Sequence, residues 1–170
     1  ARYPSEYINW FESYLEKTRT NKSFRKRIIK RNGIFKEVYE EVFPIYRLLQ
    51  KFGLEWSDCR FRNVIGSQNY DVDITGEGDQ PFDFIEVTVA DATHKEQLRM
   101  DYFAEHGTVS FTGDVSWTGT RKTGHDIQIS EDMSLHRDLN NKKLTGITDA
   151  IAKKSKKEYR DNTALLVYFD

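Results

Sequence analysis

Three acidic residues interrupt two short apolar runs near the middle of the chain, within YDVDITGEGDQPFDFIEVTVA, Tyr70 to Ala90. Asp71 and Asp73 alternate with apolar residues, and Glu86 stands inside FIEVTV, a run otherwise typical of a buried strand. Crowded carboxylates repel one another and are costly to desolvate unless a cation neutralises them. A hard divalent ion such as Mg²⁺ or Mn²⁺ takes oxygen ligands, and it can activate water or stabilise a phosphodiester transition state.

Strand periodicity predicts how these acids are brought together. In NYDVDIT the two aspartates share one face, and the alternate residues Tyr70, Val72 and Ile74 share the other. In the next run Glu86 falls on the opposite face from its apolar neighbours, and GEGDQP between the runs predicts a hairpin connection. Paired in this way, the strands gather the acids on one face. Alternatively, the aspartates are the solvent side of an edge strand, because half-buried strands alternate in the same way.

The surrounding pattern predicts the elements that position this hairpin. Helices are expected over 4–17, in a short basic segment ending at Gly33, and over 34–53, where Pro44 should introduce a kink. A strand around CRFRNVIG precedes the hairpin, and a helix over KEQLRMDYFAEHG follows it. A later helix has Leu144, Ile147 and Ile151 at its apolar positions, and TALLVYFD is typical of a central strand. The order predicts an α/β fold with a mixed sheet flanked by helices.

Length and composition exclude several classes of protein. A chain of 170 residues predicts one domain, here an N-terminal helical extension over 1–33 and a core over 34–170 with an insertion over 108–129. One cysteine excludes a disulfide framework, and the four histidines lack zinc-ligand spacing. No apolar run is long enough to span a membrane, so we expect a cytoplasmic protein without a membrane partner. Nucleotide-binding and serine-hydrolase motifs are absent.

Charge is unevenly distributed although the net charge is only −1. Nine basic residues and one acid lie between Glu16 and Lys36, and seven basic residues and two acids lie between Lys142 and Arg160. The segment from Glu37 to Glu105 has fifteen acids and six basic residues. Basic blocks around an acidic centre suit a polyanion such as DNA. The expected phosphate-binding residues are Arg25, Lys26, Lys30, Lys153 and Lys157. The alternative is that these lysine-rich blocks are solvated helix faces.

The insertion allows two interpretations. Its segment SFTGDVSWTGTRKTGH combines Trp117 with Arg121, Lys122 and His125 among glycines. Such a loop could close on nucleic acid, with the aromatic ring stacking and the cations touching phosphate. The alternative is a plain β-hairpin.

On YDVDI and IEVT the sequence resembles the PD-(D/E)xK nuclease superfamily, which has the restriction-endonuclease-like αβββαβ core. The resemblance implies Asp71 and Glu86 as catalytic metal ligands, with Asp73 as a competing or second ligand. The matching element order extends from about Ile34 to Asp170. The stretch from IEVTVA through LRMDYFAEHG to NTALLVYFD also looks like bacterial and phage proteins of this general type.

The resemblance has departures that affect the expected catalytic groups. Thr88 occupies the position where the motif has lysine, although it also suits an ordinary β-branched strand residue. Because some members supply the basic group from the following helix, Lys95 is the implied substitute. Many members also use an acid from the first core helix, which points to Glu41 or Glu37.

These observations favour a Mg²⁺- or Mn²⁺-dependent endo- or exodeoxyribonuclease that binds nucleic acid, DNA in the first place. The alternative is a catalytically inactive protein of the same fold that binds nucleic acid or a protein partner, which the threonine at position 88 favours. A homodimer is left open.

Overall fold

The computed structural model describes residues 1–21, 23, 34–64, 66, 68–77, 80, 82–90, 94–110, 113–120, 124–130 and 136–169. Its elements are α1 (Pro4–Thr20), α3 (Ile34–Glu37), the π-helical segment η1 (Val38–Val42), α4 (Phe43–Phe52), β1 (Cys59–Asn63), β2 (Val72–Gly76), β3 (Phe84–Val89), α5 (His94–His106), β4 (Val115–Thr120), β5 (Gly124–Ile129), α6 (His136–Lys154) and β6 (Thr163–Tyr168). The predicted basic helix before Gly33 lies outside the described residues.

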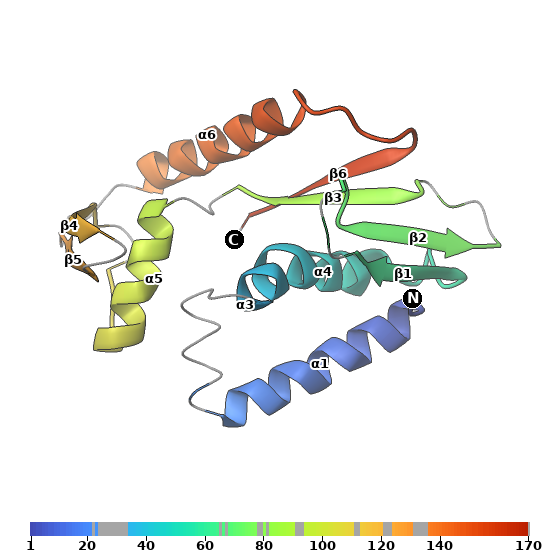
Figure 1. Ribbon diagram of the computed structural model, residues 1–170, viewed down its shortest axis with the longest axis horizontal. Helices are drawn as coiled ribbons and strands as arrows, with labels where there is room; N and C mark the ends of the chain where they lie inside the picture. The colour runs from blue at the N-terminus through green and yellow to red at the C-terminus, as the bar shows by residue number, and fades with distance from the viewer. Residues whose placement is uncertain are drawn as a thin grey trace.

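Four of these strands form one mixed sheet in the order β1-β2-β3-β6. The first three are an antiparallel meander, and β6 returns parallel to β3. Helices α1 and α4 lie on one face of the sheet and α6 on the other (Figure 1). The predicted mixed α/β class, with a meander and a last strand that returns after a helix, is therefore confirmed.

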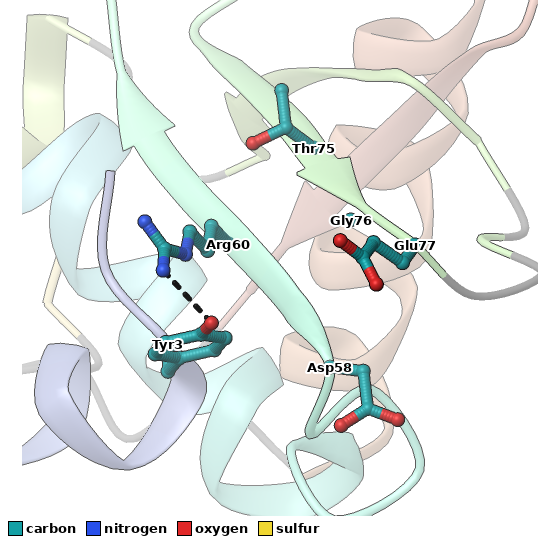
Figure 2. Close-up of a pocket in the computed structure, with 6 residues that line it drawn as sticks. All are labelled: Tyr3, Asp58, Arg60, Thr75, Gly76 and Glu77. Atoms are coloured by element: carbon teal, nitrogen blue, oxygen red, sulfur yellow. Dashed lines mark hydrogen bonds between the residues drawn. The ribbon is translucent and has the colours of Figure 1, made fainter.

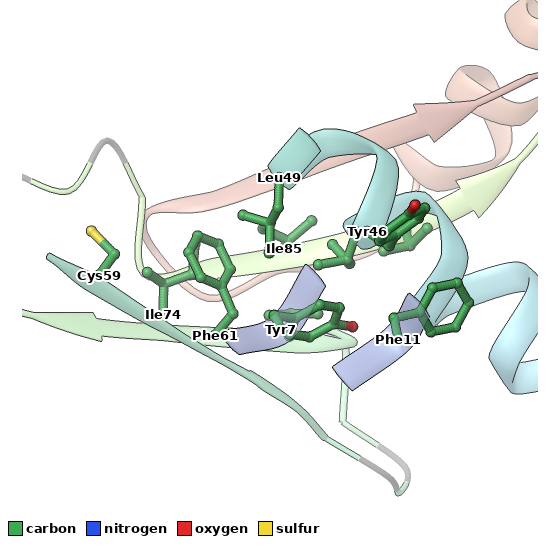
Figure 3. Packing of buried hydrophobic residues seen from close by; sticks show 11 residues of the cluster. Tyr7, Phe11, Tyr46, Leu49, Cys59, Phe61, Ile74 and Ile85 are labelled. Atoms are coloured by element: carbon green, nitrogen blue, oxygen red, sulfur yellow. The ribbon is translucent and has the colours of Figure 1, made fainter. Parts of the chain in front are cut away.

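The core lies between the meander and helices α1 and α4 (Figure 3). Tyr7 and Phe11, one helical turn apart, are buried against Ile45 and Leu49 of α4. The strands contribute alternate residues to this core: Cys59, Phe61, Val72, Ile74, Ile85 and Val87. The opposite face of β2 and β3 thus carries Asp73, Phe84, Glu86 and Thr88, as the alternation predicted.

The segment expected as one kinked helix is divided into α3, η1 and α4. The Phe43 N–H donates to the Val38 carbonyl, five residues back, which makes this turn a π-helix. The next residue, Pro44, has no N–H to donate and lies in the first turn of α4, where that loss is tolerated. The wider turn carries Glu41 and contacts β3.

The insertion is a β-hairpin, which decides between the two structural interpretations given for it. Strands β4 and β5 pair with each other in a two-stranded sheet next to α5, beside the main sheet (Figure 1). Gly113 enters this hairpin where a Cβ atom would lie 1.7 Å from the Ser130 carbonyl oxygen, so a side chain is excluded there. The side chain of Trp117 is 38% exposed.

Two sequence expectations for the C-terminal half were wrong. The final strand β6 is at the edge of the described sheet, not at its centre, and every residue of it is half-buried. Helix α6 leaves two of its apolar positions exposed, Leu144 at 62% and Ile151 at 44%, while Ile147 is half-buried. An apolar run is equally compatible with a central strand and with an edge strand covered on both faces, so composition alone could not decide.

Candidate functional site

A buried glutamate with two ammonium partners forms the centre of the candidate site. Glu86 on β3 is 3% exposed. Its Oε1 accepts hydrogen bonds from the Nζ atoms of Lys154, at the end of α6, and Lys157, three residues later. The Lys157 contact is 3.1 Å, and this hydrogen bond raises the pKa of the Lys157 ammonium. The site thus joins residues 68 and 71 positions apart in the chain.

Asp71 reaches the same place from the residue before β2. Its Oδ2 accepts the Val87 backbone N–H at 2.7 Å, so the carboxylate lies beside the strand that carries Glu86. Burial raises the pKa of the Asp71 carboxyl. The Val87 hydrogen bond opposes this rise, the negative charge of Glu86 adds to it, and the two lysines lower it. The predicted convergence of Asp71 and Glu86 therefore exists in the structure.

A third acid approaches from the π-helical turn. Glu41 is half-buried, and its pKa is raised from 4.5 to about 7. Burial is the largest cause, followed by the negative charge of Asp71; Glu37, Glu40 and Glu86 add smaller contributions. Glu41, one of the two helix acids that the resemblance implied, is thus near enough to Asp71 and Glu86 for their charges to raise its pKa.

The structure places Asp73 differently from Asp71. Asp73 is 7% exposed, and both of its oxygens accept hydrogen bonds from the Arg62 guanidinium of the neighbouring strand. The two residues are in direct register on β1 and β2. Asp73 is therefore neutralised by an arginine and is not grouped with Glu86. Thr88 is half-buried on β3 opposite Val167 of β6, as an ordinary strand residue would be.

Lys95 does not reach the acids. Its ammonium lies 2.9 Å from Asp114 in an exposed ion pair between α5 and the start of the hairpin. The basic groups at Glu86 instead come from the Lys153–Lys157 cluster, in which Lys153 itself is exposed. Five of the expected phosphate-binding or loop residues lie outside the described residues: Arg25, Lys26, Lys30, Arg121 and Lys122.

Two contributors to the site escaped the sequence analysis. Lys154 was passed over although it stands between two residues singled out for phosphate, because helical periodicity alone does not say which lysine turns inward. Tyr159 donates a hydrogen bond to the Lys154 carbonyl at 3.1 Å. Burial and the charges of Glu86 and Asp71 raise the pKa of this tyrosine, so it lies at the same cluster.

A pocket of about 580 Å³ lies away from these acids, at the opposite end of the β1–β2 hairpin. Figure 2 shows Arg60 donating to the Tyr3 hydroxyl, with Asp58 and Glu77 on the pocket wall. Its lining includes none of Glu41, Asp71, Glu86, Lys154 and Lys157. The pocket is therefore separate from the acidic cluster.

The acidic cluster fits a hard cation by its chemistry. Its donors are carboxylate oxygens, and burial together with like charge raises the pKa of both Glu41 and Asp71. A divalent cation would favour the ionised forms and offset that cost. Within the described part of the chain, no group of three His, Cys, Asp or Glu side chains is arranged to hold a metal ion. Metal binding at Glu86 would thus require its carboxylate to exchange a lysine for the ion.

Comparison with known proteins adds no relative: no family model matches the chain, and no curated protein or solved structure matches it. None of the helices in the described ranges is long and apolar enough to cross a membrane.

Proposed function

We propose that this protein is a metal-dependent nuclease that hydrolyses phosphodiester bonds in DNA, with a restriction-endonuclease-like core. The observation that supports this most is the meeting of Asp71, Glu86 and Glu41 with Lys154 and Lys157 at one place. Carboxylates that ligate a hard ion next to ammonium groups are the components that phosphodiester hydrolysis needs. The element order, with Asp71 immediately before the second strand and Glu86 on the third, is consistent with the family resemblance.

Each residue has a distinct role in this proposal. Asp71 and Glu86 would hold Mg²⁺ or Mn²⁺, with Glu41 completing the carboxylate set from the helix side. A bound ion of this kind lowers the pKa of a water ligand and stabilises charge on the phosphoryl oxygens. Thr88 occupies the position of the motif lysine, and Lys154 would take over the role of that lysine, because its ammonium already contacts the Glu86 carboxylate. Lys157 lies on the same oxygen and would neutralise an incoming phosphate.

The test is a cleavage assay on plasmid and on single-stranded DNA with Mg²⁺ or Mn²⁺, comparing the wild type with the Asp71→Ala, Glu86→Ala double variant. We expect the wild type to cleave and the double variant to lose cleavage by at least 100-fold. Asp114→Ala is the matched control, because it removes an exposed aspartate that pairs with Lys95 away from the cluster. Cleavage that persists in the double variant would exclude this site.

One observation favours a second candidate, an inactive protein of the same fold that binds nucleic acid or a protein partner. Glu86 already has two ammonium partners on one oxygen, so its charge is compensated without a metal ion. Titration with Mn²⁺ by calorimetry separates the two candidates. Binding that disappears in Asp71→Ala supports the nuclease, and the absence of carboxylate-dependent binding supports the inactive protein.

A further inference from the structure

Two aromatic rings and an arginine form a cluster immediately beside the acids. The rings of Tyr70 and Phe84 are 4.5 Å apart between centroids. The guanidinium carbon of Arg160 lies 5.2 Å from the Tyr70 ring centroid and 5.4 Å from that of Phe84. Both rings are half-buried and Arg160 is exposed, so the cluster is accessible to solvent.

The sequence had assigned Tyr70 to the core face together with Val72. In the structure it precedes β2, is not part of the core cluster, and packs on Phe84 instead. Phe84 shares its face of β3 with Glu86, two residues away. The two rings are therefore on the face of the sheet that carries the candidate site.

Three chain segments each contribute one residue to the acidic site and one to the aromatic cluster. Tyr70 adjoins Asp71, Phe84 is two residues before Glu86, and Arg160 is three residues after Lys157. Backbone and side-chain hydrogen bonds hold the segments together. Asn69 Nδ2 donates to the Glu158 carbonyl at 2.8 Å, and the Asp83 N–H donates to the Asn162 carbonyl at 3.0 Å. The cluster is thus held at a fixed place relative to the acids.

We propose that Tyr70, Phe84 and Arg160 form a stacking platform for an unpaired base of a single-stranded DNA whose phosphate lies at Lys157 and Lys154. Aromatic rings and arginine guanidinium planes both stack on nucleobases, and every base offers such a face. A base inside a duplex has both faces covered by its neighbours, so the platform selects single strands. The inference rests on the proposed function because it names the substrate class of that site.

The experiment measures binding without catalysis. A fluorescently labelled oligo-dT of 15 nucleotides and a duplex of the same length are titrated by anisotropy in EDTA at low salt, where phosphate contacts are strong. We expect the wild type to bind the single strand more tightly. Tyr70→Leu and Arg160→Ala should each weaken single-strand binding about tenfold, within the range for loss of one stacked base.

The matched control is Arg60→Ala. Arg60 also lies over a tyrosine ring, with its guanidinium carbon 4.4 Å from the Tyr3 ring centroid, but at the pocket of Figure 2. The Arg60→Ala substitution removes the same charge and the same kind of cation–ring contact as Arg160→Ala, and it should change single-strand binding less than twofold. Phe84→Leu gives a second test of the platform with an apolar residue retained, and circular dichroism checks the fold of each variant.

Equal weakening by Arg60→Ala and Arg160→Ala, or no preference for the single strand, would overturn the platform. The nuclease proposal is scored separately, by cleavage of the same oligonucleotide and duplex in Mg²⁺. If the oligonucleotide binds as expected but nothing cleaves it, the platform stands and the nuclease fails. If the wild type cleaves duplex and binds no single strand, the nuclease stands and the platform fails.

Discussion

Two regions of the molecule bury a charged side chain, and they do so in different ways. Arg99 on α5 is 9% exposed, and Glu86 on β3 is 3% exposed. Arg99 donates to the backbone carbonyls of Ser110 and Gly113 and to the Glu96 carboxylate, all within fourteen residues of it. These bonds tie α5 to the segment that leads into the β4–β5 hairpin. Its charge is thus satisfied by local partners.

The Glu86 carboxylate accepts hydrogen bonds from Lys154 and Lys157, which are far along the chain, and it has like charges near it. Burial is the largest cause of the raised pKa of both nearby acids, Asp71 and Glu41; the charge of Glu86 adds to both, and that of Asp71 adds to the rise at Glu41. Nothing about packing the sheet requires three acids at one place, since an apolar residue would cost less. A buried charge with local backbone partners therefore indicates structure, and a buried charge among like charges indicates a candidate site.

The largest expected effect is on DNA cleavage, and it distinguishes Lys154 from Lys95 as the catalytic lysine. Lys154→Met should lower cleavage by about 100- to 1,000-fold, the loss typical of removing one electrostatic group from an active site. Lys95→Met should change it less than twofold, because Lys95 is in an exposed pair with Asp114. Single-turnover cleavage measures both. A larger loss in Lys95→Met would return the catalytic role to α5.

The next effect is on stability and concerns the structural charge. Arg99→Met removes the guanidinium that donates hydrogen bonds to two backbone carbonyls and to the Glu96 carboxylate. The substitution should therefore destabilise the fold by about 2–4 kcal/mol. Urea unfolding measures this change. DNA cleavage at a temperature where the variant is folded should stay near that of the wild type. A stable Arg99 variant that has lost cleavage would contradict the contrast between the two regions.

The sequence predicted the strands of the sheet and two of the acids, but not all of the residues that meet at the site. Alternation placed Asp71 and Glu86 correctly, because a strand fixes the direction of each side chain by its parity. It did not show that Asp73 pairs with Arg62, because parity does not say which residue of the neighbouring strand lies in register with it. It could not place Lys154, since a contact 68 residues apart depends on how α6 packs over the sheet.

A smaller effect follows from the raised pKa of Glu41. Its pKa is about 7 in the folded state against 4.5 ordinarily, so folding takes up a proton between these values. The stabilising contribution is complete below pH 4.5 and is lost as the pH rises through about 7. After allowance for solvent screening we expect about 1 kcal/mol, or a fall in Tm of about 2–4 °C between pH 4.5 and 8.

Glu41→Gln should remove most of this pH dependence in thermal unfolding. Glu40→Gln is the matched control, since that carboxylate lies 3.8 Å from the Lys36 ammonium in a helical pair. Because a metal ion favours the ionised acid, Mg²⁺ should stabilise the wild type more at pH 8 than at pH 5. The same Mg²⁺ stabilisation in Glu41→Gln would separate the glutamate from the proposed metal site.

The smallest expected effect is at the exposed ion pair of Lys95, the lysine to which the family resemblance gave a catalytic role, with Asp114. Lys95 and Asp114 are 52% and 71% exposed, and their charges are screened by solvent. A double-mutant cycle with Lys95→Ala and Asp114→Ala should give a coupling energy below about 1 kcal/mol. The equivalent cycle with Glu86→Gln and Lys154→Met should give a larger coupling, because both side chains there are mostly buried. Equal couplings would mean that burial does not distinguish the two pairs, and the contrast between a local charge and a site charge would then fail.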